Sequence, residues 1–218
     1  MHNVRTYNAI SAKGLDRFSA EKYVVSEDCV TPEAFILRSQ KLHTEIVPDS
    51  LLAVARAGAG VNNIPVSDYT EQGIVVFNTP GANANAVKEL IVAGLLLGSR
   101  DIYGGMSYVQ ELGHIDDAAE MGKLLEKEKK RFAGTEIVGK TLGVVGLGAI
   151  GSIIANLALD LGMNVIGYDP AISVEAAWQL SSRVERMESI EKLLANADFV
   201  TLHVPAIHAT KHLINTKT

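Results

Sequence analysis

The stretch Gly146-Leu147-Gly148-Ala149-Ile150-Gly151 decides the fold of this 218-residue chain. An apolar run, Thr141 to Val145, precedes it, and a helical run, Ser152 to Leu161, follows it. A second apolar run, Asn164 to Tyr168, then ends at Asp169. Strand, glycine turn, helix, strand and acid in this order form the fingerprint of a dinucleotide-binding βαβ unit. A glycine turn with a purely structural role is the alternative, since such turns also occur in other loops.

Each glycine of the fingerprint answers a physical need. Gly146 permits the tight turn out of the strand, and Gly148 lets a pyrophosphate approach the backbone without a Cβ in the way. Gly151 allows the helix to pack closely on the strand. The free N–H groups at the start of that helix then face the phosphates. The motif therefore predicts cofactor contacts at Gly146, Gly148 and Gly151.

Asp169 narrows the choice of cofactor. Its carboxylate can accept hydrogen bonds from the ribose hydroxyls of the adenosine, and it would repel a 2′-phosphate. Positions 170 to 182 contain no Lys or Arg that could hold such a phosphate, the next basic residue being Arg183. The sequence therefore predicts NAD rather than NADP.

Composition limits the classes of partner and compartment. With 47% hydrophobic and 21% charged residues the chain is typical of a globular protein. Its net charge of −5 gives no sign of the positively charged surface that binds nucleic acid. The single cysteine, Cys29, excludes an intrachain disulfide and fits a reducing compartment. The longest apolar run, Leu90 to Leu97, is shorter than the ~20 residues that cross a bilayer. We expect a cytoplasmic chain that binds neither nucleic acid nor membrane.

Two domains are expected from the remaining pattern. Short strands alternate with helical segments over residues 1–98, which favours a small α/β domain with a mostly parallel sheet; the candidate strands are Lys22–Val25, Ala34–Leu37, Leu52–Ala55 and Ile74–Val76. A largely apolar helix, Asn85 to Ser99, is predicted to be buried between the domains. Residues 99–218 form the second domain, with a polar helical excursion at Arg100 to Arg131 and a third strand at Phe199 to His203. A complete dinucleotide fold has about six strands, so we expect this domain to be incomplete.

Four segments, in order, resemble the NAD-dependent D-isomer 2-hydroxyacid dehydrogenases, and most closely their phosphoglycerate dehydrogenases. The segments are Arg56-Ala-Gly-Ala-Gly-Val-Asn-Asn-Ile64, Asn78-Thr-Pro-Gly-Ala-Asn83, Gly139 to Gly151, and Ala197 to Pro205. The resemblance implies an α/β fold made of a small flavodoxin-like substrate domain and a Rossmann-type NAD-binding domain, both incomplete. The implied reaction of the complete protein is the oxidation of 3-phosphoglycerate to 3-phosphohydroxypyruvate, a step of serine biosynthesis. Another D-2-hydroxyacid substrate remains an alternative, as do a non-catalytic NAD-responsive binding module and a partial product with no independent role.

The first of these segments supports a substrate role by its own chemistry. Arg56 follows a strand end, and Gly58 and Gly60 expose backbone N–H groups in a turn suited to an anion. The resemblance implies that the loop holds the substrate carboxylate through Arg56, Ala57, Gly58, Ala59 and Gly60. A surface arginine beside a glycine turn is the alternative. Arg38, at another strand end, is a candidate ligand for a phosphate, and Asn62 stands where the family commonly has Asp.

The resemblance also extends the cofactor site. It implies that Ala149 and Ile150 present backbone to the pyrophosphate and that Thr79 lies near the nicotinamide. Val204 and Pro205 would line the adenine side.

The resemblance implies no catalytic residue in this chain, because the family's Arg, Glu and His positions lie in sequence beyond Thr218. We therefore expect the 218 residues alone to have no dehydrogenase turnover. His203 corresponds to a cofactor-side turn rather than to the acid–base residue. His208 and His212 are four apart and could share a helix face as metal ligands, but a loop is favoured and no metal is predicted. The complete protein is expected to be a homodimer, with Arg100 to Arg131 contributing to the interface.

Overall fold

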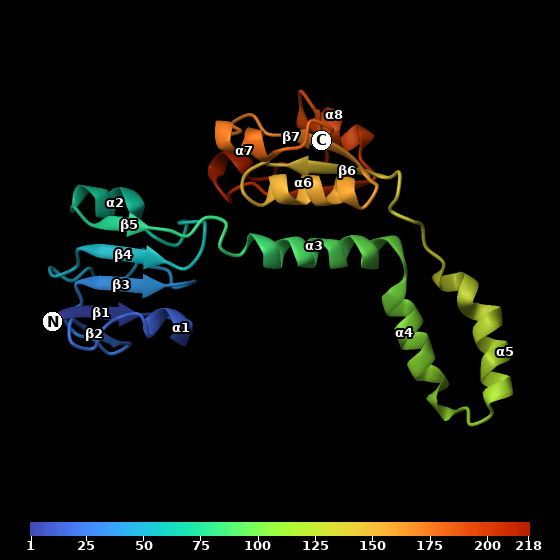
Figure 1. Cartoon of the computed structure of the whole chain (residues 1–218), viewed down its shortest axis with the longest axis horizontal. Helices are drawn as coiled ribbons and strands as arrows, with labels where there is room; N and C mark the ends of the chain where they lie inside the picture. The colour runs from blue at the N-terminus through green and yellow to red at the C-terminus, as the bar shows by residue number, and fades with distance from the viewer. The chain divides into compact units, whose positions relative to one another are not determined.

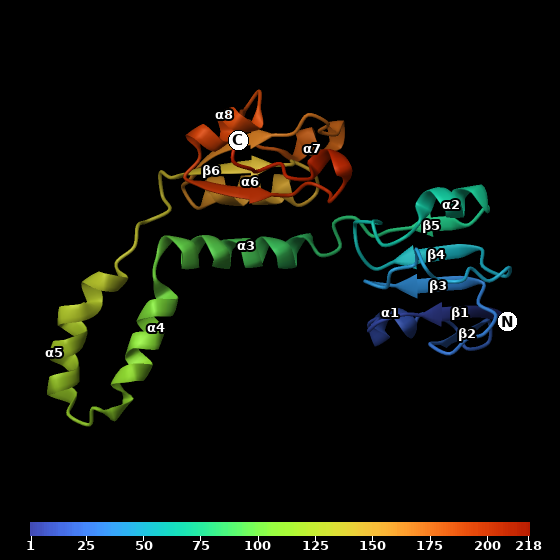
Figure 2. The ribbon, with the colours of Figure 1, turned by 180° about the vertical axis from the view of Figure 1, so that it is seen from behind.

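The computed structural model describes all residues from Met1 to Thr218, and they form two compact units. The first contains Met1–Asn83 and Pro205–Lys211, and the second contains Ala84–Val204 and His212–Thr218. The expected boundary after residue 98 falls inside helix α3 (Ala84–Ser99), which joins the second unit because Leu95 packs into that unit's core. Figures 1 and 2 show the chain from two opposite sides.

The first unit is built on a parallel five-stranded sheet in the order β2-β1-β3-β4-β5. This 2-1-3-4-5 order is that of flavodoxin-like folds, which confirms the predicted fold class. The strands are β1 (His2–Thr6), β2 (Tyr23–Ser26), β3 (Ala34–Leu37), β4 (Ala53–Arg56) and β5 (Val75–Phe77), and the helices are α1 (Ala12–Leu15) and α2 (Val66–Glu71).

One face of this sheet carries the core of the first unit. Phe35, Leu37 and Val54 pack with Tyr69 of α2, each at most 1% exposed. On the edge strand β5, Val76 joins the core, whereas Val75 and Phe77 are exposed. The alternation follows from the two-residue period of a strand.

The second unit contains a parallel four-stranded sheet in the order β8-β7-β6-β9. This corresponds to strands 3-2-1-4 of the six-stranded dinucleotide fold, so the Rossmann-type class is confirmed. The strands are β6 (Thr141–Val145), β7 (Asn164–Tyr168), β8 (Glu185–Arg186) and β9 (Phe199–Leu202), and the helices after the first three are α6 (Gly151–Asp160), α7 (Val174–Gln179) and α8 (Ile190–Asn196). The 3-10 turn η3 (His208–Thr210) follows β9 along the chain and belongs to the first unit.

Helices cover both faces of the second sheet. Leu142 and Val144 of β6 face α6 and Leu95 of α3, whereas Val145 faces Leu193 of α8. The glycine turn therefore lies at the end of a strand that is buried on both faces, as parallel sheets require.

The polar excursion is helical, as predicted. It comprises α4 (Ile102–Glu111), η1 (Leu112–His114), α5 (Ala118–Glu128) and η2 (Lys129–Phe132). Asp101 and Asp117 cap the two α-helices by accepting hydrogen bonds from the N–H groups of Gly104 and Ala119. Arg131 and Glu128 form an ion pair 2.9 Å long beside Phe132.

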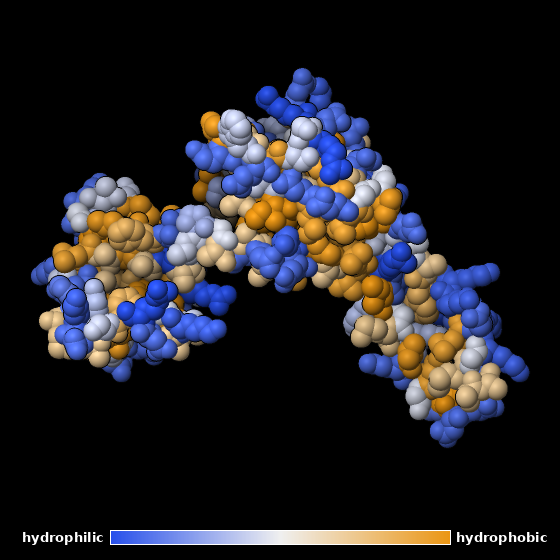
Figure 3. All heavy atoms as spheres, in the orientation of Figure 1, coloured by the Kyte–Doolittle hydropathy of each residue, from blue (hydrophilic) through white to orange (hydrophobic).

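Two sequence predictions about the fold need correction. The second sheet has a fourth strand, β8, which the three-strand prediction missed because its two residues are charged and exposed. Helix α3 is not buried all round, because Leu90 is 73% exposed and Leu97 is 53% exposed. Figure 3 shows hydrophobic residues gathered along this helix.

The packing of α8 gives a test of the second core. Truncating Leu193, which is fully buried, should lower the free energy of unfolding by about 2–5 kcal/mol through lost burial and a residual cavity. The Leu193→Ala variant would be compared by urea denaturation with Leu90→Ala, an exposed leucine expected to cost no more than about 0.5 kcal/mol. Equal losses in the two variants would contradict this distribution of core and surface.

Candidate functional site

The glycine turn between β6 and α6 has the geometry that each glycine was predicted to provide. Gly146 has a φ of +88°, and a Cβ on it would stand 2.7 Å from the carbonyl oxygen of His203. A Cβ on Gly151 would overlap the carbonyl oxygen of Gly146, so only glycine lets the helix start this close to the strand. Gly148 differs from both, because no atom lies within 4 Å of its Cβ position and the residue is exposed. The space in front of Gly148 is open to a ligand.

The turn presents unpaired donors to that space. The N–H groups of Gly148, Ala149 and Ile150 donate to no protein atom, and all three precede the ten-residue helix α6. Backbone N–H groups at a helix N-terminus, together with the positive end of its dipole, bind phosphate. These residues therefore fit the pyrophosphate of a dinucleotide.

Asp169 lies at the end of β7, next to the turn. One carboxylate oxygen accepts a hydrogen bond from the N–H of Leu147 at 2.8 Å, and the other accepts from Ala171 at 2.9 Å. A carboxylate oxygen accepts more than one hydrogen bond, so both can also receive ribose hydroxyls. The first basic residue after it is Arg183, whose Nη2 lies 3.8 Å from Oδ1 of Asp160, the last residue of α6. This arrangement fits NAD and provides no cation for a 2′-phosphate.

His203 supports the turn from the end of β9. Its N–H donates to Val145 at 2.7 Å, and its Nε2 lies 2.9 Å from the hydroxyl oxygen of Thr201. Burial lowers the pKa of His203 below its usual value, because desolvation disfavours the charged form. Val204 follows, with its Cγ1 only 3.0 Å from the Cβ position of Gly146. His203 is thus a packed neighbour of the cofactor turn.

The arginine loop of the first unit begins where β4 ends. The Arg56 side chain folds back along its own loop, and its Nε donates to the carbonyl oxygen of Arg38 at 3.0 Å. Its Nη1 is buried without a partner, 2.9 Å from the Cβ position of Gly60. A side chain at position 60 would require the guanidinium to shift.

The segment after β5 donates hydrogen bonds to the carbonyl groups of this arginine loop. Asn78 donates its side-chain amide to the carbonyl oxygen of Ala59 at 2.7 Å, and the N–H of Thr79 donates to Gly58 at 3.0 Å. With the carbonyls engaged, the N–H groups of Ala59, Gly60 and Val61 donate to no protein atom. An arc of free N–H groups beside an arginine is an anion-binding concavity.

A cavity of about 510 Å³ adjoins the loop within the first unit. It is lined by Arg38, Gly58 and Thr79, which the sequence singled out, and by Ser11 and Asn83, which it did not. The Arg38 side chain is exposed and forms no ion pair. Thr79 therefore lies beside the predicted substrate loop; its predicted position near a nicotinamide remains a prediction, as do the adenine contacts of Val204 and Pro205.

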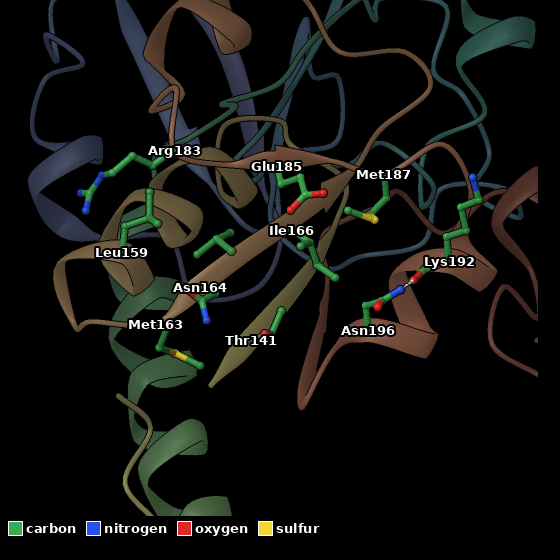
Figure 4. A pocket seen from close by; sticks show the side chains of 11 residues that line it. Thr141, Leu159, Met163, Asn164, Ile166, Arg183, Glu185, Met187, Lys192 and Asn196 are labelled. Atoms are coloured by element: carbon green, nitrogen blue, oxygen red, sulfur yellow. Dashed lines mark hydrogen bonds between the residues drawn. The ribbon is translucent and has the colours of Figure 1, made fainter. Parts of the chain in front are cut away.

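A larger cavity, of about 600 Å³, lies in the second unit at the amino ends of β6 and β7 (Figure 4). Thr141 and Asn164 begin those two strands, so this cavity is at the opposite edge from the glycine turn. Two of its charged side chains are paired, Arg183 with Asp160 and Lys192 with Glu188. It is not part of the candidate site.

The histidines near the end of the chain form no metal centre in the structure. His208 lies in η3 and His212 follows it in a left-handed backbone conformation with a φ of 57°, so the two do not share an α-helix face. No group of three His, Cys, Asp or Glu side chains has the arrangement of a metal site.

The fold and the glycine turn define an α/β protein with a Rossmann-type dinucleotide site. Residues 105–218, more than half of the chain, match the family described as "D-isomer specific 2-hydroxyacid dehydrogenase, NAD binding domain". The chain therefore belongs to the D-isomer specific 2-hydroxyacid dehydrogenase family, and its cofactor is NAD.

Named relatives agree with this membership. The D-3-phosphoglycerate dehydrogenase of Methanocaldococcus jannaschii is 42% identical over 166 residues, 76% of this chain and 29% of that protein. The hydroxypyruvate reductase of Thermotoga maritima is 37% identical over 191 residues, 85% of this chain and 56% of that protein. The chain thus spans about a third of the length of the phosphoglycerate dehydrogenases that it matches.

Solved structures agree on the fold. The D-mandelate dehydrogenase of Rhodotorula graminis superposes with a TM-score of 0.72 at 27% identity, covering 98% of this chain and 69% of that one. The NAD⁺-bound 3-phosphoglycerate dehydrogenase of Entamoeba histolytica has a TM-score of 0.71 at 24% identity, over 99% of this chain and 67% of that one. No helix of the chain has both the length and the apolar character needed to span a membrane.

The open space at Gly148 gives a test of the cofactor site. Gly148→Ala should leave stability nearly unchanged, because nothing in the fold meets the new Cβ, yet it should weaken NADH binding about tenfold or more by blocking the pyrophosphate. Binding can be followed by calorimetry or by energy transfer from Trp178, the only tryptophan, to NADH. Gly122→Ala on α5, where the Cβ also meets nothing, is the matched control. Unaltered NADH affinity in Gly148→Ala would refute the proposed pyrophosphate position.

Proposed function

We propose that the complete protein oxidises D-3-phosphoglycerate to 3-phosphohydroxypyruvate with NAD, in the cytoplasm. The observation that carries the proposal is the pairing of two anion-binding features in the first unit. The free N–H groups of Ala59, Gly60 and Val61 lie beside Arg56, and the adjoining cavity is lined by Arg38. A substrate with a carboxylate at one end and a phosphate at the other matches two such features.

The loop would bind and orient the substrate carboxylate. The N–H groups of residues 59–61 and the guanidinium of Arg56 supply charge-assisted hydrogen bonds, which are stronger than neutral ones. Arg38 would hold the phosphoryl group, and the hydrogen bonds from Asn78 and Thr79 to the loop carbonyls keep the N–H arc open before the substrate arrives. A preformed site of this kind saves the entropic cost of ordering it on binding.

NAD, when bound, accepts the hydride from C2 of the hydroxyacid, and the hydroxyl proton must pass to a base. Within these 218 residues, Gly148, Ala149 and Ile150 would hold the pyrophosphate and Asp169 the ribose, while Leu147 keeps Asp169 in place. His203 is not proposed as the base, since its Nε2 contacts Thr201 and its pKa is lowered by burial.

The proposed partner is a second copy of the chain. Tyr103, Met106 and Val109 of α4 are more than half exposed, which is unusual for apolar side chains on one helix of a monomer. The α4–α5 segment would thus contribute an interface, in keeping with the sequence prediction of a homodimer.

A NAD-responsive binding module without catalysis remains the second candidate. It is favoured by one observation: the cofactor turn presents free N–H groups at residues 148–150, while the ring of His203 beside it is engaged with Thr201. The two functions differ in whether the complete protein converts a hydroxyacid substrate.

The phosphate assignment predicts a selective loss. Arg38→Gln should weaken binding of D-3-phosphoglycerate about 10- to 100-fold, the cost of a lost charged hydrogen bond, and leave the weaker binding of D-glycerate unchanged. Titrations followed by NMR would measure both ligands on the full chain. Arg100→Gln, at another exposed arginine without an ion pair, is the control. Equal effects on both ligands would contradict a phosphate role for Arg38.

Turnover by the 218 residues alone is predicted to be absent. The reaction needs a group that removes the hydroxyl proton, and the proposed substrate loop offers only arginine and amide donors. Incubation with NAD and D-3-phosphoglycerate should give no rise in absorbance at the NADH band, with a phosphoglycerate dehydrogenase relative as positive control. NADH formation by the purified chain would show that one of its own residues acts as the base.

A further inference from the structure

Asn8 connects two loops at the carboxyl edge of the first sheet. It lies two residues after β1, in a left-handed backbone conformation with a φ of 63°, which asparagine tolerates better than most residues. Its side-chain oxygen accepts hydrogen bonds from the N–H of Ser39 at 2.9 Å and from the N–H of Gln40 at 2.8 Å. Because β1 and β3 are neighbouring strands, this one side chain ties the loop after β1 to the loop after β3.

The loop after β3 holds both arginines of the proposed substrate site. The side chain of Arg38 lines the cavity, and its carbonyl oxygen accepts the hydrogen bond from Nε of Arg56 at 3.0 Å. Two residues further on, the carbonyl oxygen of Gln40 accepts from Nδ2 of the buried Asn63 at 2.6 Å. The loop is therefore held through its N–H groups by Asn8 and through its carbonyl groups by the segment after β4.

The other neighbours of Asn8 also belong to the cavity. The three residues that follow it, Ala9, Ile10 and Ser11, line the cavity together with Arg38 and Gly58. Asn8 itself is not among the lining residues, and it is exposed. It can therefore act on a ligand in the cavity only through the loops that it holds.

We propose that Asn8 is a positioning residue that fixes the spacing between Arg38 and the carboxylate-binding loop of Arg56. The inference rests on the proposed function, because it explains how the two anion-binding features of that site are kept at one separation. With the acceptor of Asn8 in place, the N–H groups of Ser39 and Gln40 are engaged, and the backbone that carries Arg38 has one position.

A fixed spacing matters only to a ligand that uses both features. Once one end of such a ligand is bound, the strength of the second contact depends on how well the distance between the two features matches the ligand. A ligand with a single anionic group needs one feature and follows it when the loop moves. The difference between these two kinds of ligand therefore separates a positioning role from a general loss of stability, which would weaken both.

The test replaces Asn8 by glycine, which adopts the left-handed conformation and lacks only the acceptor. Asn8→Gly in the full chain should weaken binding of D-3-phosphoglycerate about tenfold. D-glycerate carries only the carboxylate and sn-glycerol 3-phosphate only the phosphoryl group, so both should bind within about twofold of the unmodified chain. Titrations followed by NMR would measure all three ligands.

Asn8→Asp is the conservative variant, because a carboxylate oxygen accepts the same two hydrogen bonds. Repulsion by its charge would act alike on the phosphoryl groups of D-3-phosphoglycerate and sn-glycerol 3-phosphate. The ratio of these two affinities should therefore equal that of the unmodified chain. Hydrogen exchange gives a second readout: the amides of Ser39 and Gln40 should exchange faster in Asn8→Gly and stay protected in Asn8→Asp.

Ser26→Gly is the matched control. The Ser26 hydroxyl oxygen, at the end of β2, accepts a hydrogen bond from the N–H of Asp28 at 3.1 Å, and neither residue lines the cavity. The substitution thus removes a similar side-chain acceptor from a loop of the same sheet, and it should leave all three affinities unchanged. Melting curves of all variants would verify that each is folded.

The outcomes separate this inference from the proposed function. If the unmodified chain binds D-3-phosphoglycerate and Asn8→Gly binds it equally well, or loses all three ligands by the same factor, the positioning role of Asn8 is overturned while the proposed function stands. If the unmodified chain binds NADH but not D-3-phosphoglycerate, the proposed substrate is overturned and the role of Asn8 with it.

Discussion

The close approach of the glycine turn to its surroundings is the constraint on which the second unit depends. Gly146 lies against the backbone of His203, and Gly151 lies against the carbonyl of Gly146, so the end of β9, the turn and the start of α6 meet with room for hydrogens alone. This contact fixes the turn just before α6, in which the N–H groups of Gly148, Ala149 and Ile150 have no protein partner and the space in front of Gly148 is open. The hydrogen bond from Leu147 to Asp169 then fixes the carboxylate beside those donors.

Both units have a loop with free backbone N–H groups at the carboxyl end of a parallel strand. Each has a loop after a buried parallel strand, and in each loop successive N–H groups lack protein partners, at 148–150 in one and 59–61 in the other. Backbone donors bind any anion, since they carry no net charge of their own. Selectivity must therefore come from the nearby side chains, which are Asp169 beside residues 148–150 and Arg56 and Arg38 beside residues 59–61.

Local pattern was enough to predict β6, β7 and the glycine turn between β6 and α6. Thr141–Val145 and Asn164–Tyr168 are strands with the predicted bounds, because apolar runs next to a glycine turn leave few alternatives. The first strand of the chain, His2–Thr6, was missed, although Val4 and Thr6 are buried between two neighbouring strands. Its polar composition carries no strand signal, and only pairing with residues 23–26 and 34–36 makes it central. Ser11 and Asn83 were missed for the same reason, because cavities join segments that are distant in sequence.

The same distinction explains why the substrate is harder to derive than the cofactor. The glycines of a dinucleotide site lie in one contiguous stretch of sequence, and each has a role in the backbone geometry that a side chain would prevent. The substrate loop depends on Asn78 and Thr79 for its shape and on Arg38 for its adjoining cavity, residues that reach it only through tertiary contacts. Its guanidinium, on Arg56, is held by a hydrogen bond to the carbonyl oxygen of Arg38, another residue distant in sequence. A short stretch of sequence is therefore enough to predict the cofactor, whereas the substrate depends on contacts between segments that such a stretch does not contain.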